Sequence, residues 1–175
     1  MYIVSPEAPA SPPAPTPVEI PTSSLDIIRR HVVWSMAAGL VPIPLVDLAA
    51  VAGTQLKMIS NLADHYKLPF DEERGRSVIG SLIGTVSALS IGRGVLGSLI
   101  KSIPVVGTIG GMAVVPVMAG AATYALGKIF AAHFESGGTL LTFDARAMKD
   151  EFSRQLKVGE EVAHGLKDKV AAGIS

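Results

Sequence analysis

The chain of 175 residues has no cysteine, few aromatic residues and no excess of either charge. The absence of cysteine excludes a disulfide, a thiolate metal site and a cysteine nucleophile, and it leaves the redox compartment open. Its 15 basic residues balance 15 acidic ones, so the chain lacks the basic surface that neutralises phosphates. Three Tyr, five Phe and one Trp leave little for a platform on which bases stack. These shortages argue against a nucleic-acid partner.

Patterns of catalysis and of cofactor binding are also scarce. The segment Gly92–Gly97 spells GxGxxG, but an apolar helix precedes it where a dinucleotide site needs a strand. No acid that would hold a ribose occurs between Glu73 and Glu135. The four histidines are scattered and form no HExxH pair. We therefore expect no enzyme activity, no cofactor and no metal site, although a triad assembled in space would leave no such mark.

The N-terminal segment differs in composition from the rest of the chain. It lacks the order of a secretory signal, basic residues followed by an apolar core, so export by that route is not expected. Residues 1–23 hold most of the twelve prolines, and such a tract cannot bury a core. We expect a disordered Pro-rich arm that serves as a plain tether, with a Pro-rich ligand for a partner as the alternative.

What the chain does contain is one long uncharged run. From Ser102 to Gly127 there is no acidic or basic side chain. A helix of that length reaches roughly 39 Å at 1.5 Å per residue, which is enough to cross the hydrocarbon core of a bilayer. The run favours contact with a membrane, and the alternative is a buried helix of a soluble bundle.

Proline, glycine and acidic residues mark the expected helix ends. The acids Asp71–Glu73 suit the start of a helix, where the helix dipole favours them, and Asp47 suits another start in the same way. Pro116 should kink or restart the helix that contains it. We expect two helical hairpins, each with a Pro turn, made of helices at about 24–39, 44–66, 71–102 and 104–134.

A C-terminal amphipathic helix should follow the hairpins. Ser136–Gly138 stops the last hairpin helix, and Thr142 or Asp144 then caps the new one. Gly159 and Gly165 should weaken its continuation. The predicted fold is all-α and membrane-associated, with three parts: the arm at 1–23, a helical-hairpin domain at 24–143, and the C-terminal helix and tail at 144–175.

Three groups of residues are candidate sites. Small residues let two helix backbones approach closely, and the first group is predicted to pack helices or to join copies of the chain: Gly80, Gly84, Gly107, Gly111 and Gly120. The second group forms the two apolar turns: Pro42, Pro44 and Pro104. The third group, a basic pair followed by tryptophan, resembles an interfacial anchor: Arg29, Arg30 and Trp34.

Charge is placed unevenly along the chain. It lies mainly in the arm, in the 57–76 segment and after Lys128, while the two Pro turns carry none. Both hairpins could therefore enter an apolar phase tip first, with the charged segments left on one side. The uncharged segment Val32–Val46 must supply both arms of the first hairpin, so that hairpin reaches only partway across a bilayer.

Several segments together resemble one family. They read GLVPIPLVDLAAV and QLKMISNLADHY, then ERGRSVIGSLIG and SIPVVGTIGG, and finally GAATYALGKIFAAHFESGG with a trailing LTFD. Covering about Ile27–Asp144, they resemble a bacterial domain of unknown function that is often found C-terminal to Era/Ras-like GTPase domains. The resemblance implies a helical, membrane-associated module. The chain lacks the Gly-rich loop, switch threonine and base-reading motif of a GTPase, so the resemblance brings no catalytic residue.

These observations predict a non-enzymatic scaffold or adaptor on the cytoplasmic side of a membrane. Its expected partners are membrane lipid, further copies of the chain, and a separate GTPase or another protein. One alternative is a self-assembling structural protein that shapes or coats a membrane. Another is a small channel or transporter subunit, with Arg93 and Lys101 as its pore charges.

Overall fold

The computed structural model of the protein describes residues 19–40, 46–92 and 109–173. Within these ranges the chain forms helices and no strand, so the all-α prediction is confirmed. Pro42, Pro44, Pro104 and Gly107 lie outside the described residues, as do Arg93 and Lys101. The helices are α1 (Thr22–Ala38), α2 (Val46–His65), α3 (Glu72–Gly92), α5 (Ile109–Glu135) and α6 (Lys149–Ala171).

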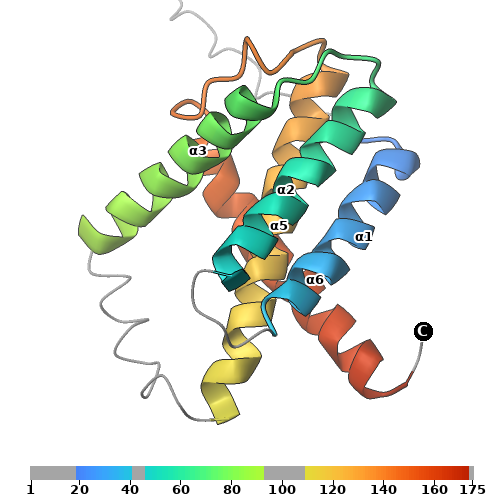
Figure 1. Ribbon diagram of the computed structural model, residues 1–175, viewed down its shortest axis with the longest axis vertical. Coiled ribbons are helices and arrows are strands. Elements are labelled where there is room, and N and C mark those ends of the chain that lie inside the picture. The colour runs from blue at the N-terminus through green and yellow to red at the C-terminus, as the bar shows by residue number, and fades with distance from the viewer. Residues whose placement is uncertain (1–18, 41–45, 93–108, 174–175) are drawn as a thin grey trace, which may run out of the picture.

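The central helix of the bundle is α5, on which α1, α2 and α6 all pack (Figure 1). It has no acidic or basic residue before Lys128, so it has no strongly polar face to turn towards water. A helix that is apolar on all sides is buried in a protein interior. Accordingly, Ala121, Leu126 and Phe130 are fully buried.

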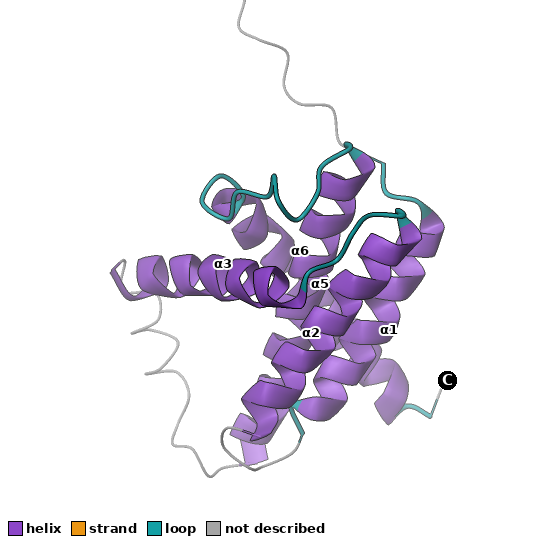
Figure 2. Ribbon diagram, turned by 45° about the horizontal axis from the view of Figure 1, so that its top comes forward, coloured by secondary structure: helices purple, strands orange, loops and turns teal. Residues whose placement is uncertain are grey.

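The first predicted hairpin is present as α1 and α2, which run antiparallel and side by side (Figure 1, Figure 2). Ile28 and Val32 of α1 share one apolar core with Met58 and Leu62 of α2. The partners of α3 are α2 and α6, and α3 leans away from α5 (Figure 1). The helices expected to form the second hairpin therefore diverge.

Two of the predicted helix ends are confirmed in atomic detail. At the start of α3, the carboxylate of Asp71 accepts the backbone N–H of Arg74 at 2.7 Å, and Glu72 and Glu73 fill the first turn. After α5, Gly137 adopts a φ of +82°, which favours glycine. Its N–H donates to the carbonyl of Phe134 at 2.9 Å, which closes the helix end.

Two other helix starts differ from the prediction. α1 begins at Thr22 instead of after Ser24, because the carbonyl of Pro21 already accepts the N–H of Ser24 at 3.1 Å. α6 begins at Lys149 and not at a cap on Thr142 or Asp144. The carboxylate of Asp144 instead accepts the N–H groups of the two residues Arg146 and Ala147, at 2.8 and 3.2 Å, and closes a separate turn.

Residues expected to break helices do not interrupt them. α5 continues through Pro116, and α6 continues through Gly159 and Gly165 to Ala171. At Gly159 the reason is close packing, because a Cβ there would lie 2.6 Å from the carbonyl oxygen of Ala121. Gly159 thus allows α6 to pack closely on α5. This contact stabilises α6, although glycine has a low helix propensity.

Candidate functional site

One end of the bundle has an apolar surface. α1 ends there, and α2 and α5 begin there (Figure 1). Four large side chains at this end, named here the apolar end, stay exposed to 61, 43, 46 and 39%: Leu40, Val114, Val115 and Met118. The end of α1 and the start of α5 meet closely at this point, because a Cβ at Gly39 would lie 3.1 Å from the Cα of Pro116.

The sequence around the apolar end is almost free of charge. The segments Val32–Val46 and Ile109–Gly127 have no acidic or basic residue. Asp47 is the exception, and it occupies the first turn of α2, where the helix dipole favours an acid. Exposed apolar residues that form a contiguous patch mark a site of contact with a partner or a membrane. The apolar end is therefore the first candidate for a functional surface.

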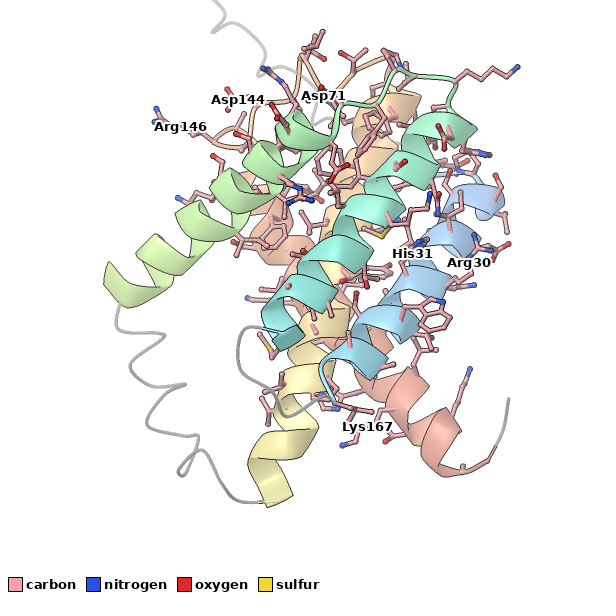
Figure 3. The ribbon with its side chains drawn as sticks, in the orientation of Figure 1. Arg30, His31, Asp71, Asp144, Arg146 and Lys167 are labelled. Atoms are coloured by element: carbon pink, nitrogen blue, oxygen red, sulfur yellow. The ribbon has the colours of Figure 1, made fainter. Side chains whose placement is uncertain are left out.

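The opposite end of the bundle is polar and carries Asp71, Asp144 and Arg146 (Figure 3). A shallow groove of about 520 Å³ lies there, lined by the start of α3 and by the 141–146 loop. Arg74 joins its two walls, since its guanidinium donates to the carbonyls of Leu140 and Leu141 at 3.3 and 3.1 Å. The side chain of Arg74 is thus engaged in holding the loop.

The predicted interfacial residues lie on the outer face of α1. Arg29 and Arg30 are exposed, and Trp34, one turn closer to the apolar end, is 63% exposed. Lys57 is exposed on the neighbouring helix α2. The three residues named from the sequence therefore share one accessible surface, and the structure adds a fourth residue from a distant part of the sequence.

The close contact between α5 and α1 uses a stripe of residues on α5 that was not predicted as a set. Its members recur at intervals of three or four residues and face α1: Pro116, Gly120, Thr123 and Gly127. A Cβ at Gly120 would lie 2.6 Å from the Cγ of Met36, and one at Gly127 would lie 2.7 Å from the Cγ1 of Ile28. Small residues at this spacing let the two helices meet.

The other glycines predicted for helix packing have different surroundings. A Cβ at Gly80 or at Gly84 would meet nothing within 4 Å in the described structure. Gly111 belongs to the first turn of α5. Among Gly80, Gly84 and Gly120, whose surroundings the structure describes, only Gly120 has a close contact with another helix. A role for Gly80 and Gly84 between copies of the chain stays a prediction.

Buried polar side chains link the three helices α1, α2 and α5. Thr123 donates to the hydroxyl of Ser35 at 2.8 Å, and Gln55 donates to the hydroxyl of Thr123 at 3.4 Å. All three are at most 2% exposed. A buried polar network is stabilising only when its members find partners, and it then fixes how the helices align. The sequence signal that could have predicted this network is the spacing of Ser24, His31 and Ser35, which places them on one face of α1.

His31 continues this polar seam towards the charged end. Its Nδ1–H donates to the carbonyl of Ile27 at 2.8 Å, because a carbonyl can only accept. Nε2 is then the acceptor for the amide N–H of Asn61 on α2, at 3.2 Å. Both ring nitrogens are thus engaged in hydrogen bonds. Burial, followed by the charges of Arg30 and Lys57, lowers the pKa of His31 below its ordinary value.

Stability should fall when the pH is lowered through about 6.5, the ordinary pKa of histidine. Below that pH the unfolded chain binds a proton at position 31 that the folded chain resists, so unfolding becomes easier. The slope from one such group is at most about 1.4 kcal/mol per pH unit. Denaturant unfolding between pH 7.5 and 5 should show the fall, and His31→Gln should flatten it. The exposed His164→Gln is the matched control, and an equal change in both variants would contradict the role of His31.

Within the described ranges, no group of three or more His, Asp and Glu lies close enough to hold a metal ion. One stretch of a described helix, Val114–Glu135, is long and apolar enough to cross a membrane by length and composition. In the 18-residue window that meets these criteria, 67% of the residues are buried inside the bundle. A core helix of a soluble bundle meets the same criteria, so the accessible surface decides more than the length does.

The chain is similar to a protein described as magnetosome membrane protein 22 from Magnetospirillum gryphiswaldense. The two are 41% identical over 155 residues, which cover 89% of this chain and 80% of the relative. No solved structure matches the chain. A family profile matches residues 24–159, a range that includes nearly all of α1, all of α2, α3 and α5 and about the first half of α6. The chain therefore belongs to the family described as Domain of unknown function (DUF697).

Proposed function

We propose that the protein is a non-enzymatic, membrane-associated helical module whose apolar end enters one leaflet of a bilayer from the cytoplasmic side. The observation that carries the proposal is the exposure of Leu40, Val114 and Val115 at an end of the bundle where the segments of α1, α2 and α5 are almost uncharged. Similarity to a protein described as a magnetosome membrane protein supports membrane association.

Entry into one leaflet fits this bundle better than a full crossing does. The sides of α5 are covered by α1, α2 and α6, so most of the helix has no surface to offer to lipid. Its exposed aliphatic residues are confined to the segment Val114–Met118, close to its start. Insertion of only this end into a leaflet would not disturb the packing of the rest of the bundle.

The apolar end supplies a modest amount of binding energy. Its four large side chains are about half exposed, and full burial of one such side chain contributes roughly 1.5–3 kcal/mol. Together they supply roughly 3–6 kcal/mol, which is in the range of reversible attachment. We therefore expect a second contribution to membrane binding from another part of the surface.

The end of α6 limits how deep the bundle goes on one side. Lys167, Asp168 and Lys169 are exposed there, and Figure 3 places Lys167 far from the charged end of the bundle. Charged groups are costly inside the hydrocarbon layer. This side of the bundle therefore stays at the level of the headgroups, which long lysine side chains can reach.

Anchoring by the apolar end leaves the charged end in water, available to a protein partner. The groove between α3 and the 141–146 loop is a suitable place for such a contact, in keeping with a scaffold or adaptor. A separate GTPase is the partner that the family resemblance suggests. Self-assembly is the alternative, and the open surface at Gly80 and Gly84 favours it.

Vesicle flotation tests the proposal directly. The full chain is mixed with sealed vesicles, placed under a density gradient and centrifuged. We expect the protein to rise with the vesicles and to stay behind when vesicles are omitted. Retention in the dense fractions with every lipid composition would contradict membrane association.

A further inference from the structure

We propose that the outer face of α1 and α2 binds anionic lipid headgroups through Arg29, Arg30 and Lys57, named here the basic band. The inference rests on the proposed insertion of the apolar end and adds to it the class of lipid that the protein selects. It also supplies the second contribution to membrane binding that the modest apolar surface calls for.

The three cations of the basic band come from two neighbouring helices. Asn61 of α2 bonds His31, so Lys57, four residues earlier on α2, lies about one turn closer to the apolar end than Arg30 does. Burial is the main cause that lowers the pKa of His31, and the charges of Arg30 and Lys57 add to it. Both cations are therefore near the same imidazole ring, between α1 and α2. Figure 3 shows His31 turned towards α2 and Arg30 pointing away from the bundle.

Arg29 extends the basic band to the other side of α1. Burial raises the pKa of Tyr124 on α5, and the charge of Arg29 partly offsets this rise, so the guanidinium lies towards α5. The basic band thus spans the outer face of α1 from the side of α5 to the side of α2. A flat surface of headgroups can contact all three cations at once.

No carboxylate neutralises the basic band in the described part of the chain. The ion pairs found there join Arg76 with Glu72, Lys149 with Asp150, and Arg154 with Glu151. Asp26, one turn from Arg29 and Arg30 towards the charged end, forms no ion pair with either of them. The basic band therefore keeps a net positive charge that anionic headgroups can balance.

On each helix the basic band lies about the thickness of one leaflet away from the helix end nearest the tip. Along α1, the distance from Arg30 to Leu40 is about 15 Å, and along α2 the distance from Val46 to Lys57 is about 16 Å. One leaflet of a bilayer has a hydrocarbon layer of about 15 Å, half of the usual thickness. On the side of α1, Arg29 and Arg30 therefore lie at the headgroups when Leu40 reaches the middle of the bilayer, and the bundle tilts so that Lys167, on the side of α6, also stays at the headgroups.

The residues between the basic band and the apolar end fit the same placement. Val33 and Trp34 are 44 and 63% exposed, one turn below the arginines. Tryptophan prefers the boundary between headgroups and hydrocarbon, where its ring is apolar and its N–H finds a partner. The outer face of α1 thus changes from basic to amphipathic to aliphatic in the order in which a leaflet changes.

Binding to two kinds of vesicle tests the inference. One kind is made of phosphatidylcholine alone, and the other is a mixture of phosphatidylcholine and phosphatidylglycerol. Each Lys or Arg near an anionic surface raises partitioning roughly fivefold, so three raise it on the order of 100-fold. We expect wild-type chain to prefer the mixed vesicles by about that factor, and the preference to shrink at high salt because salt screens the charges.

The decisive variant replaces all three cations: Arg29→Gln, Arg30→Gln and Lys57→Gln. It should lose the preference for mixed vesicles and keep its weaker binding to phosphatidylcholine. The matched control removes three exposed cations elsewhere, by Lys67→Gln, Arg146→Gln and Lys157→Gln, and should keep the preference. Circular dichroism and thermal unfolding confirm that both variants are folded.

The outcomes separate this inference from the proposed function. Equal binding of wild-type chain to both vesicles, or an equal loss in the variant and its control, would overturn the inference and leave membrane insertion in place. A failure of wild-type chain to bind either vesicle would overturn the proposed function. Loss of binding to phosphatidylcholine in the triple variant alone would also overturn the inference, because the basic band would then serve insertion in general.

Discussion

Replacing Val114 and Val115 with Asp should release the protein from vesicles that the wild-type chain binds. The two side chains are 43 and 46% exposed, so the carboxylates can stay in water and the bundle should remain folded. Each charge costs about 2.5–3.5 kcal/mol inside the hydrocarbon layer. Two such costs, about 5–7 kcal/mol, together with the lost burial of two valines offset the roughly 3–6 kcal/mol that the apolar end supplies. Partitioning should fall at least 100-fold, to the background of a flotation assay.

The matched control for this double variant places the same charges on other exposed aliphatic residues. Leu141→Asp and Val158→Asp replace side chains that are 70 and 42% exposed, away from the apolar end. We expect this control to float with the vesicles as the wild-type chain does. Equal binding by both double variants would mean that the apolar end does not contact lipid.

Gly120→Leu should destabilise the bundle, because α5 meets α1 and α6 at this residue. A Cβ at Gly120 would lie 2.6 Å from the Cγ of Met36 and 3.3 Å from the Cβ of Ala163. A full leucine has no room at such a site, and overpacking costs about 1–3 kcal/mol and sometimes more. The free energy of unfolding, measured with a denaturant, should fall by at least that amount.

Gly80→Leu is the matched control, and its effect should have the opposite sign. Nothing lies within 4 Å of a Cβ at Gly80, and leucine favours a helix over glycine by up to about 1 kcal/mol. We therefore expect unchanged or slightly higher stability. Size-exclusion chromatography of the same variant tests the predicted contact between copies of the chain. Equal stability of both variants would contradict the close approach of α5 to α1.

Local rules explain the parts of the fold that could be predicted. Asp71–Glu73 marks the start of α3 and Ser136–Gly138 the end of α5, because a carboxylate at a first turn and a glycine with positive φ act within a few residues. The starts of α1 and α6 were predicted less well. Ser24 has a partner that sequence spacing does not reveal, the hydroxyl of Tyr66, 2.9 Å away. Asp144 closes a local turn with Arg146 and Ala147 and does not cap α6.

The burial of α5 could not be read from its sequence, because an apolar helix of this length suits a bundle core and a bilayer equally. Whether α5 is buried depends on which side chains pack against its stripe of small residues. Those side chains include Ile28 and Met36, which lie about 90 residues earlier in the sequence. The polar seam of Ser35, Gln55 and Thr123 escaped prediction for the same reason. Arg29, Arg30 and Trp34 were predicted because the whole pattern lies on one helix, whereas Lys57 required the packing of α1 on α2.

The depth of position 115 in a vesicle-bound protein tests the central claim most directly. The chain has no cysteine, so Val115→Cys and Leu141→Cys can each carry a single environment-sensitive fluorophore. With protein added to the outside of sealed vesicles, the label at 115 should be quenched by lipids brominated on their acyl chains and protected from aqueous iodide. The label at 141 should be quenched by iodide in the outer solution and not by those lipids. A label at 115 that iodide quenches while the protein is bound would contradict insertion of the apolar end, and a label at 141 protected from iodide outside the vesicle would contradict entry from one side.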